Sequence, residues 1–133
     1  MNAVCGTPRL VRDGIAGHEA FEEGLKNKRF INGALPRTAI GNNKNKTKLF
    51  LVAVPGSKKQ DGTIGASLTQ LADIMEYIGC YDAQNLDGGG STNMVVASNN
   101  VINPALSRKL SVSIAAVKLK KEKPQSKLKR QGR

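Results

Sequence analysis

Tryptophan is absent from this 133-residue sequence, and aromatic residues make up only 4% of it. The chain therefore has few of the side chains on which nucleic-acid bases stack in single-strand binders. It also has no apolar run of the roughly 20 residues that a membrane-spanning helix needs. The N-terminal stretch MNAVCGTPRLVRDG lacks the basic-then-apolar pattern of a signal peptide. The sequence predicts neither a transmembrane segment nor a signal peptide.

Cysteine and histidine are also scarce, with two cysteines and one histidine in the chain. Cys5 and Cys80 are too few and too far apart for a metal-binding motif, and His18 has no nucleophile near it in sequence. We therefore predict no metal site and no cofactor. The spacing leaves open whether the two cysteines are separate buried thiols or one disulfide, so it indicates no redox compartment.

The excess of positive charge is concentrated at the C-terminus. The formal net charge is +11, and residues 118–133 hold eight Lys or Arg and one Glu, which gives this stretch +7. A cationic segment with a proline and little apolar content is expected to be disordered. We therefore predict a folded domain over residues 1–117 and a basic tail over 118–133. The tail is expected to be solvated, with non-specific phosphate contacts to nucleic acid as an alternative.

The first half of the chain predicts three strands. PRLVRDG indicates a short strand over residues 9–12 that ends in an Asp-Gly turn. Residues 13–36 look like a connection with one helical turn at most, in which Phe21 and Phe30 fill the core. TAIG and KLFLVAV predict two more strands, and the apolar run over residues 49–54 indicates a strand covered on both faces. The loop SKKQDGTIGA after this run is a candidate rim for a site.

The second half contains the clearest helix signal, over residues 68–78. Ser67 and Gln70 have the spacing of a capping box, apolar residues recur on one face, and Gly79 ends the pattern. CYDAQNL then predicts a strand that ends at Asp87. A hairpin turning at Asn99-Asn100 and a last strand in LSVSIAAVKL complete the pattern. These elements predict an α+β domain whose mixed or antiparallel sheet packs against one main helix.

The stretch NLDGGGST, residues 85–92, places three glycines directly after an aspartate. Such a run serves a tight turn, an anion-binding nest of backbone N–H groups, or the close approach of a substrate to a carboxylate. It matches neither a Walker A loop nor a dinucleotide-binding fingerprint. A second feature is PRTAIG, in which Arg37 lies between a proline and a strand. A guanidinium held in this way suits bidentate capture of a phosphate or carboxylate, and a surface ion pair is the alternative.

Taken in order, these stretches resemble the phosphodiester glycosidase family. The resemblance rests on PRLVRDG, PRTAIG, the apolar strand, the capped helix, YDAQNLDGGGSTNMVV and RKLSVSIAAV. It implies hydrolysis of a sugar-1-phosphodiester resembling N-acetylglucosamine-1-phosphodiester, in an exported or envelope setting. It also implies Arg37 and Asp87 as catalytic residues, with substrate-binding roles for Thr38, Asn85, Gly88, Gly89, Gly90 and Ser91. Asp82 also matches the family pattern, either as a second acid or as a cap at the strand entry.

The sequence also departs from the family pattern. Its members normally have further strands upstream of PRLVRDG, so we expect a C-terminal part of the domain with an exposed sheet edge. Such an edge favours a homodimer. Two alternatives to an active glycosidase follow. One is a truncated remnant that binds a sugar phosphate without turnover, and the other is a basic protein that binds nucleic acid through its tail.

Overall fold

The computed structural model describes residues 4–56, 64–102, 109–110 and 112–118. Five strands form one sheet in the order β2-β1-β5-β3-β4, with every neighbouring pair antiparallel. The sheet strands are β1 (Arg9–Arg12), β2 (Ile15–Ala16), β3 (Arg37–Asn42), β4 (Leu49–Val54) and β5 (Asp82–Asn85). The helices are α1 (Lys28–Asn32) and α2 (Leu68–Tyr77), with a 3-10 turn η1 (Gly89–Ser91). The predicted α+β class is confirmed, and the sheet is antiparallel.

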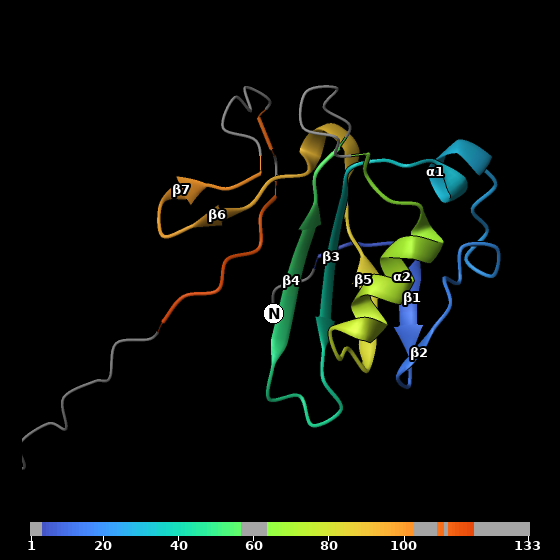
Figure 1. The fold of residues 1–133 in the computed structure, drawn as a ribbon, viewed down its shortest axis with the longest axis horizontal. Helices are drawn as coiled ribbons and strands as arrows, with labels where there is room; N and C mark the ends of the chain where they lie inside the picture. Colours follow the sequence, from blue (N-terminus) through green and yellow to red (C-terminus); the bar gives the residue numbers. More distant parts are fainter. Residues whose placement is uncertain (1–3, 57–63, 103–108, 111, 119–133) are drawn as a thin grey trace, which may run out of the picture.

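Helix α2 packs on one face of the sheet, over the β1 and β2 side (Figure 1). The predicted capping box is present, since Ser67 and Gln70 exchange hydrogen bonds between side chain and backbone at 3.2 and 2.9 Å. The apolar stripe of the helix is buried, and it belongs to one core cluster with residues of β1, β3 and β5. The buried core comprises Leu10, Val11, Ala20, Ile31, Ala39, Leu68, Leu71, Ala72, Met75, Cys80 and Ala83. Burial of this stripe fixes the helix on the sheet, because an amphipathic helix is stabilised mainly by its packed face.

The connection between β2 and β3 differs from the expectation at one of its two aromatics. Phe30 of α1 packs against the core, as predicted. Phe21 is 68% exposed, so its prediction as a core residue is wrong. Its ring lies 6.1 Å from that of His18, on the surface segment before α1. The loose spacing of these aromatics did not show which of them faces inward.

Strand β4 is the outer strand of the sheet, with its neighbour β3 on one side only among the described residues. Its six residues pair with β3 in unbroken register, from Leu49 opposite Asn42 to Val54 opposite Arg37. Phe50, Val52 and Val54 pack against the core, whereas Leu49 is 57% exposed. The prediction that this run is covered on both faces is therefore wrong. An apolar run does not by itself distinguish a central strand from an edge strand that packs only one of its faces on the core.

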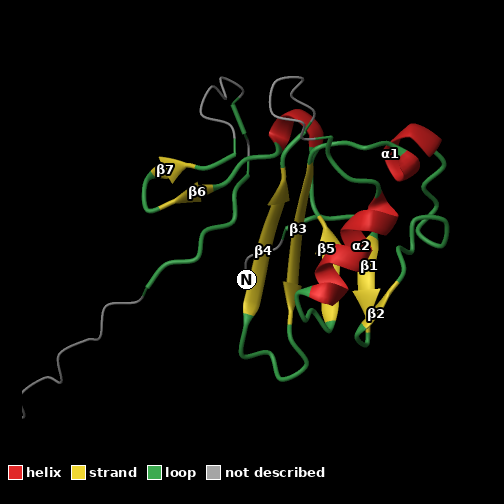
Figure 2. Cartoon of the chain, viewed as in Figure 1, coloured by secondary structure: helices red, strands yellow, loops and turns green. Residues whose placement is uncertain are grey.

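The C-terminal part of the described chain also differs from the expectation. A separate hairpin pairs β6 (Val95–Val96) with β7 (Asn99–Asn100), so the turn lies at Ala97-Ser98 rather than at Asn99-Asn100 (Figure 2). Ala97 and Ser98 have φ of 48° and 68°, values that Asn and Gly adopt more readily. Within residues 109–110 and 112–118 the structure has no strand, so the expected last strand is not formed there. Residues 57–63 of the expected rim loop and residues 119–133 of the expected tail lie outside the described residues.

Further expectations concern side-chain chemistry and membranes. Cys5 is exposed and Cys80 is buried, and both thiols are free. Across the described ranges there is no group of three or more His, Cys, Asp or Glu side chains placed to hold a metal ion. No helix among the described residues has the length and apolar character needed to span a membrane.

Candidate functional site

Arg37, the first residue of β3, is almost completely buried, with 2% of its surface exposed. Its Nε donates a hydrogen bond to the carbonyl of Ala66 at 2.8 Å. Its Nη2 donates to the carbonyls of Phe30 and Gly33 at 2.6 and 3.0 Å. The guanidinium also lies over the Phe30 ring, 5.0 Å from its centroid, within the range of a cation–π contact. The proline before it and the strand after it thus place this side chain inside the protein.

The glycine-rich loop follows β5 and is tied to the backbone around Arg37. The Leu86 N–H donates to the carbonyl of Thr38 at 2.8 Å, and the Gly89 N–H donates to that of Pro36 at 2.9 Å. A Cβ on Gly88 would lie 2.8 Å from the Pro36 carbonyl oxygen, and Gly89 has a φ of +59°. The first two glycines therefore let the loop pack against the segment that leads into β3.

A pocket of about 210 Å³ lies where these two segments meet. Five of the predicted site residues line it together. They are Arg37, Asn85, Asp87, Gly88 and Gly89. Four residues that the sequence did not mark as site residues complete the wall: Phe30, Leu35, Pro36 and Leu86. Pairing the two motifs in sequence thus predicted most of the polar lining, whereas the apolar lining carried no separate signal.

Three predicted site residues lie beside this pocket rather than in its lining. The Thr38 side chain donates to Thr92 Oγ1 at 3.4 Å, which is a weak hydrogen bond. Gly90 and Ser91 belong to the η1 turn, where Gly90 is exposed and Ser91 is partly buried. Strand alternation explains the position of Thr38, because its side chain points to the sheet face opposite that of Arg37.

Asn85 carries a polar atom without a partner at the wall of the pocket. The residue is 2% exposed, and its Nδ2 donates to the Thr7 carbonyl at 2.7 Å. This bond sets the orientation of the amide and leaves Oδ1 as a buried acceptor with no hydrogen-bond partner among the described residues. Buried polar atoms are seldom left unpaired, because the lost hydrogen bonds to water cost about 1–3 kcal/mol.

The pocket contains two oppositely charged groups, the buried guanidinium of Arg37 and the exposed carboxylate of Asp87. Burial lowers the pKa of the Arg37 guanidinium, but an arginine stays protonated in proteins. Within the described ranges, no carboxylate forms an ion pair with Arg37, and the ion pair present there joins Arg12 and Glu19. Asp87 is exposed at the mouth of the same pocket. A buried cation without a counter-ion favours an anionic ligand beside it.

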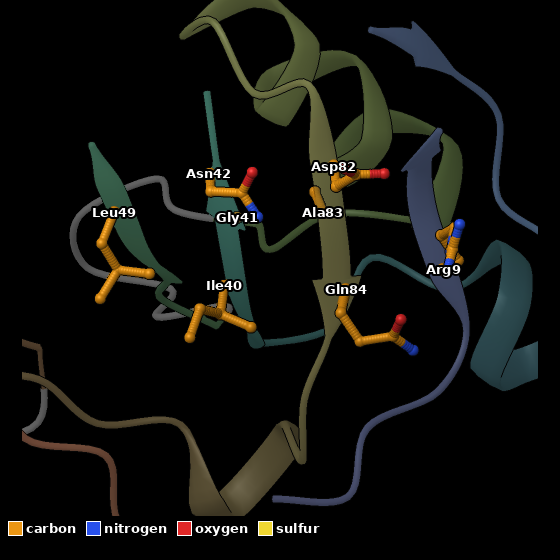
Figure 3. Close-up of a pocket in the computed structure, with 8 residues that line it drawn as sticks. All are labelled: Arg9, Ile40, Gly41, Asn42, Leu49, Asp82, Ala83 and Gln84. Atoms are coloured by element: carbon orange, nitrogen blue, oxygen red, sulfur yellow. The ribbon is translucent and has the colours of Figure 1, made fainter. Parts of the chain in front are cut away.

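A second, wider pocket of about 480 Å³ lies on the sheet itself (Figure 3). It is lined by Arg9, Ile40, Gly41, Asn42, Leu49, Asp82, Ala83 and Gln84. The side chains of Ile40, Asn42, Asp82 and Gln84 alternate with those that face α2, so they point to the face of the sheet away from α2. Asp82 begins β5 and Asp87 lies beyond its other end, so the two carboxylates line different pockets.

Comparisons with known proteins place these features in a family. A family model described as phosphodiester glycosidase matches residues 1–117. No match was found among curated proteins.

Two solved structures give the same TM-score of 0.61. A hypothetical protein from Synechocystis is 31% identical, and the match covers 72% of this chain and 17% of that one. The catalytic domain of zebrafish N-acetylglucosamine-1-phosphodiester alpha-N-acetylglucosaminidase, auto-inhibited by its pro-peptide, is 28% identical. That match covers 75% of this chain and 34% of the zebrafish chain. This chain thus spans about a third or less of each, and the family model matches most of its length. The chain belongs to the phosphodiester glycosidase family.

Proposed function

We propose that this chain hydrolyses the glycosidic bond of a sugar-1-phosphodiester resembling N-acetylglucosamine-1-phosphodiester. The observation that carries the proposal is the lining of the smaller pocket. The buried guanidinium of Arg37, which forms no ion pair with any described carboxylate, and the exposed carboxylate of Asp87 line one cavity of about 210 Å³ in a chain of this family. A sugar phosphate offers an anion to the first and an anomeric carbon to the second.

The chemistry of the reaction explains why these two groups belong together. The departing phosphate ester is a weak base, so it needs its negative charge stabilised more than it needs a proton. Arg37 supplies positive charge inside the pocket. The sugar passes through an oxocarbenium-like state, which the Asp87 carboxylate stabilises, traps or serves by activating water. Asn85, Gly88 and Gly89 complete the proposed binding surface, with Thr38, Gly90 and Ser91 beside it.

A second candidate is binding of a sugar phosphate without turnover. The same lining supports it, since Arg37 and the loop of Gly88 and Gly89 would hold a phosphate whether or not Asp87 acts on the sugar. Saturable binding of a sugar 1-phosphate by a folded chain that releases no product would single out this candidate.

The proposal is tested by comparing two carboxylates in a hydrolysis assay on a fluorogenic sugar-1-phosphodiester. Asp87→Asn removes the charge at the smaller pocket and should lower kcat by about 10² to 10⁴-fold, the usual contribution of a positioned acid or base. Because Asp87 is exposed, its substitution should change stability by no more than about 0.5 kcal/mol.

Asp82→Asn is the matched control, because Asp82 lines the other pocket. It should leave kcat within about twofold, since its charge lies away from the proposed reacting atoms. Equal activity of the wild-type and Asp87→Asn chains would contradict the role proposed for Asp87. An active Asp87→Asn chain with an inactive Asp82→Asn chain would move the site to the wider pocket.

A further inference from the structure

The guanidinium of Arg37 has little left to offer a ligand. An arginine side chain carries five N–H donors, one on Nε and two on each Nη. Three of the five are used within the protein, by the carbonyls of Ala66, Phe30 and Gly33. The two that remain are both on Nη1, which donates to no described residue. A bidentate grip on an oxyanion uses two parallel N–H groups from different nitrogens, so this geometry does not provide it.

The three carbonyls belong to segments that form the wall of the pocket. Phe30 belongs to α1, Gly33 caps the C-terminal end of that helix, and Ala66 lies just before α2. Phe30 itself lines the pocket, as do Leu35 and Pro36 of the segment between α1 and β3. The guanidinium therefore holds the end of α1, the approach to α2 and the start of β3 at fixed separations.

Close backbone contacts show how tightly this wall is built. A Cβ on Gly65 would lie 2.6 Å from the Leu35 carbonyl oxygen, and one on Gly56 would lie 2.4 Å from Pro36 Cγ. Gly88 approaches the same segment from the glycine-rich loop, with Pro36 O at 2.8 Å from an added Cβ. Loops from three parts of the chain converge on residues 35–37, so the position of Arg37 determines where the loop beside Asp87 lies.

The glycine-rich loop has donors that the fold does not use. Among the described residues, the backbone N–H groups of Asp87 and Gly88 donate to no carbonyl, whereas those of Leu86 and Gly89 are both bonded to the Pro36–Thr38 stretch. Successive unpaired N–H groups in a glycine-rich turn bind anions. They lie on the loop that contributes Asp87, Gly88 and Gly89 to the pocket.

We propose that Arg37 is a positioning residue, which builds the anion pocket through its three carbonyl hydrogen bonds, and that the anion is held mainly by the backbone N–H groups of Asp87 and Gly88. The inference rests on the proposed function in taking the bound group to be a phosphate. It differs from that function in assigning the direct contacts to the backbone rather than to the guanidinium fork.

The test uses inorganic phosphate as the probe and two substitutions of one residue. Arg37→Lys keeps the positive charge but has its donors on a single nitrogen, so it cannot replace the bonds that Nε and Nη2 make to Ala66, Phe30 and Gly33. Arg37→Met removes both the charge and the donors. The dissociation constant for phosphate is measured by calorimetry at a temperature where circular dichroism shows both variants to be folded. Arg29→Met, an exposed arginine of α1, is the control.

If Arg37 positions the pocket wall, the Arg37→Lys and Arg37→Met variants should weaken phosphate binding equally, by about ten- to a hundredfold. A displacement of the binding groups by about 1 Å has an effect of this order. Binding retained by Arg37→Lys and lost by Arg37→Met would show a direct charge contact and overturn the inference. Unchanged phosphate binding in both variants would also overturn the inference, because Arg37 would then contribute to stability alone. A wild-type chain that binds no phosphate would show that the pocket is not an anion site.

Turnover is measured separately on the same proteins, so that the two proposals fail in different ways. If the proposed function is wrong, the wild-type chain would bind phosphate but would not hydrolyse a sugar-1-phosphodiester. The positioning role would still stand if Lys and Met weakened that binding equally.

Discussion

At the scale of single residues, Gly88 shows that packing as well as chemistry explains the glycine run. An added Cβ would meet Pro36 O at 2.8 Å and Arg37 Cα at 3.5 Å, both of them backbone atoms that cannot rotate away. Gly88→Ala should therefore destabilise the fold by about 1–3 kcal/mol, as overpacking of a well-packed site does. Chemical denaturation of the two proteins measures this difference.

The control for this substitution is Gly17→Ala. No atom lies within 4 Å of a Cβ at Gly17, and its φ is not in the left-handed region. This substitution should be neutral, or stabilise by about 0.4–1 kcal/mol through the lower entropy of the unfolded chain. Equal effects of the two substitutions would show that the contact with Pro36 does not constrain residue 88.

The sequence predicted which polar residues line the pocket, but it did not predict the contacts that they make. The pairing of PRTAIG with NLDGGGST pointed to Arg37, Asn85, Asp87, Gly88 and Gly89, which the structure brings to one pocket. What the sequence did not show is the direction of the Arg37 donors, because the three carbonyls that accept them lie 4, 7 and 29 residues away. Contacts of this kind follow from the tertiary fold and have no local signature.

At the scale of elements, helix α2 begins at a capping box formed by Ser67 and Gln70, which a single substitution can disrupt. Ser67 Oγ accepts from the Gln70 N–H, and Gln70 Oε1 accepts from the Ser67 N–H. Ser67→Ala removes the first of these bonds and should destabilise the protein by about 1 kcal/mol. Thermal unfolding should show this as a loss of a few degrees in Tm, about 3–6 °C for a domain of this size.

Thr69→Ala, on the exposed side of the first turn, is the reference for this change. It should raise stability slightly or leave it unaltered, since alanine has the higher helix propensity. A Tm for Ser67→Ala no lower than that for Thr69→Ala would mean that the cap contributes nothing beyond propensity.

Elements with a strong local pattern were predicted well, and those that depend on distant partners were not. Helix α2 was expected over residues 68–78 and is found over Leu68–Tyr77. Strand β4 was placed correctly along the chain, but its exposure was misjudged because an apolar run does not show whether a neighbour covers it. The stretch LSVSIAAVKL alternates like a strand, yet its described part pairs with no other strand, since a strand forms only where an edge accepts it.

At the scale of the whole molecule, the two faces of the sheet differ in a way that the sequence only partly indicated. One face is covered by α2 and holds the core, and the other carries the wider pocket, whose lining includes Ile40, Asn42, Asp82 and Gln84. The smaller pocket lies at the ends of β3 and β5, where the motif loops meet. The α+β class followed from counting elements, whereas the strand order, which brings β3 and β5 together, required the structure.

The measurement that tests the account most directly is hydrolysis of a sugar-1-phosphodiester by this chain in water labelled with ¹⁸O. Attack of water on the anomeric carbon breaks the bond from that carbon to the bridging oxygen, so the label enters the sugar and the phosphate monoester leaves with the bridging oxygen. The account predicts labelled sugar and unlabelled phosphate by mass spectrometry. Label in the phosphate would show attack at phosphorus, and the absence of product would show that the chain does not catalyse this hydrolysis. Either result contradicts a phosphodiester glycosidase activity of this chain.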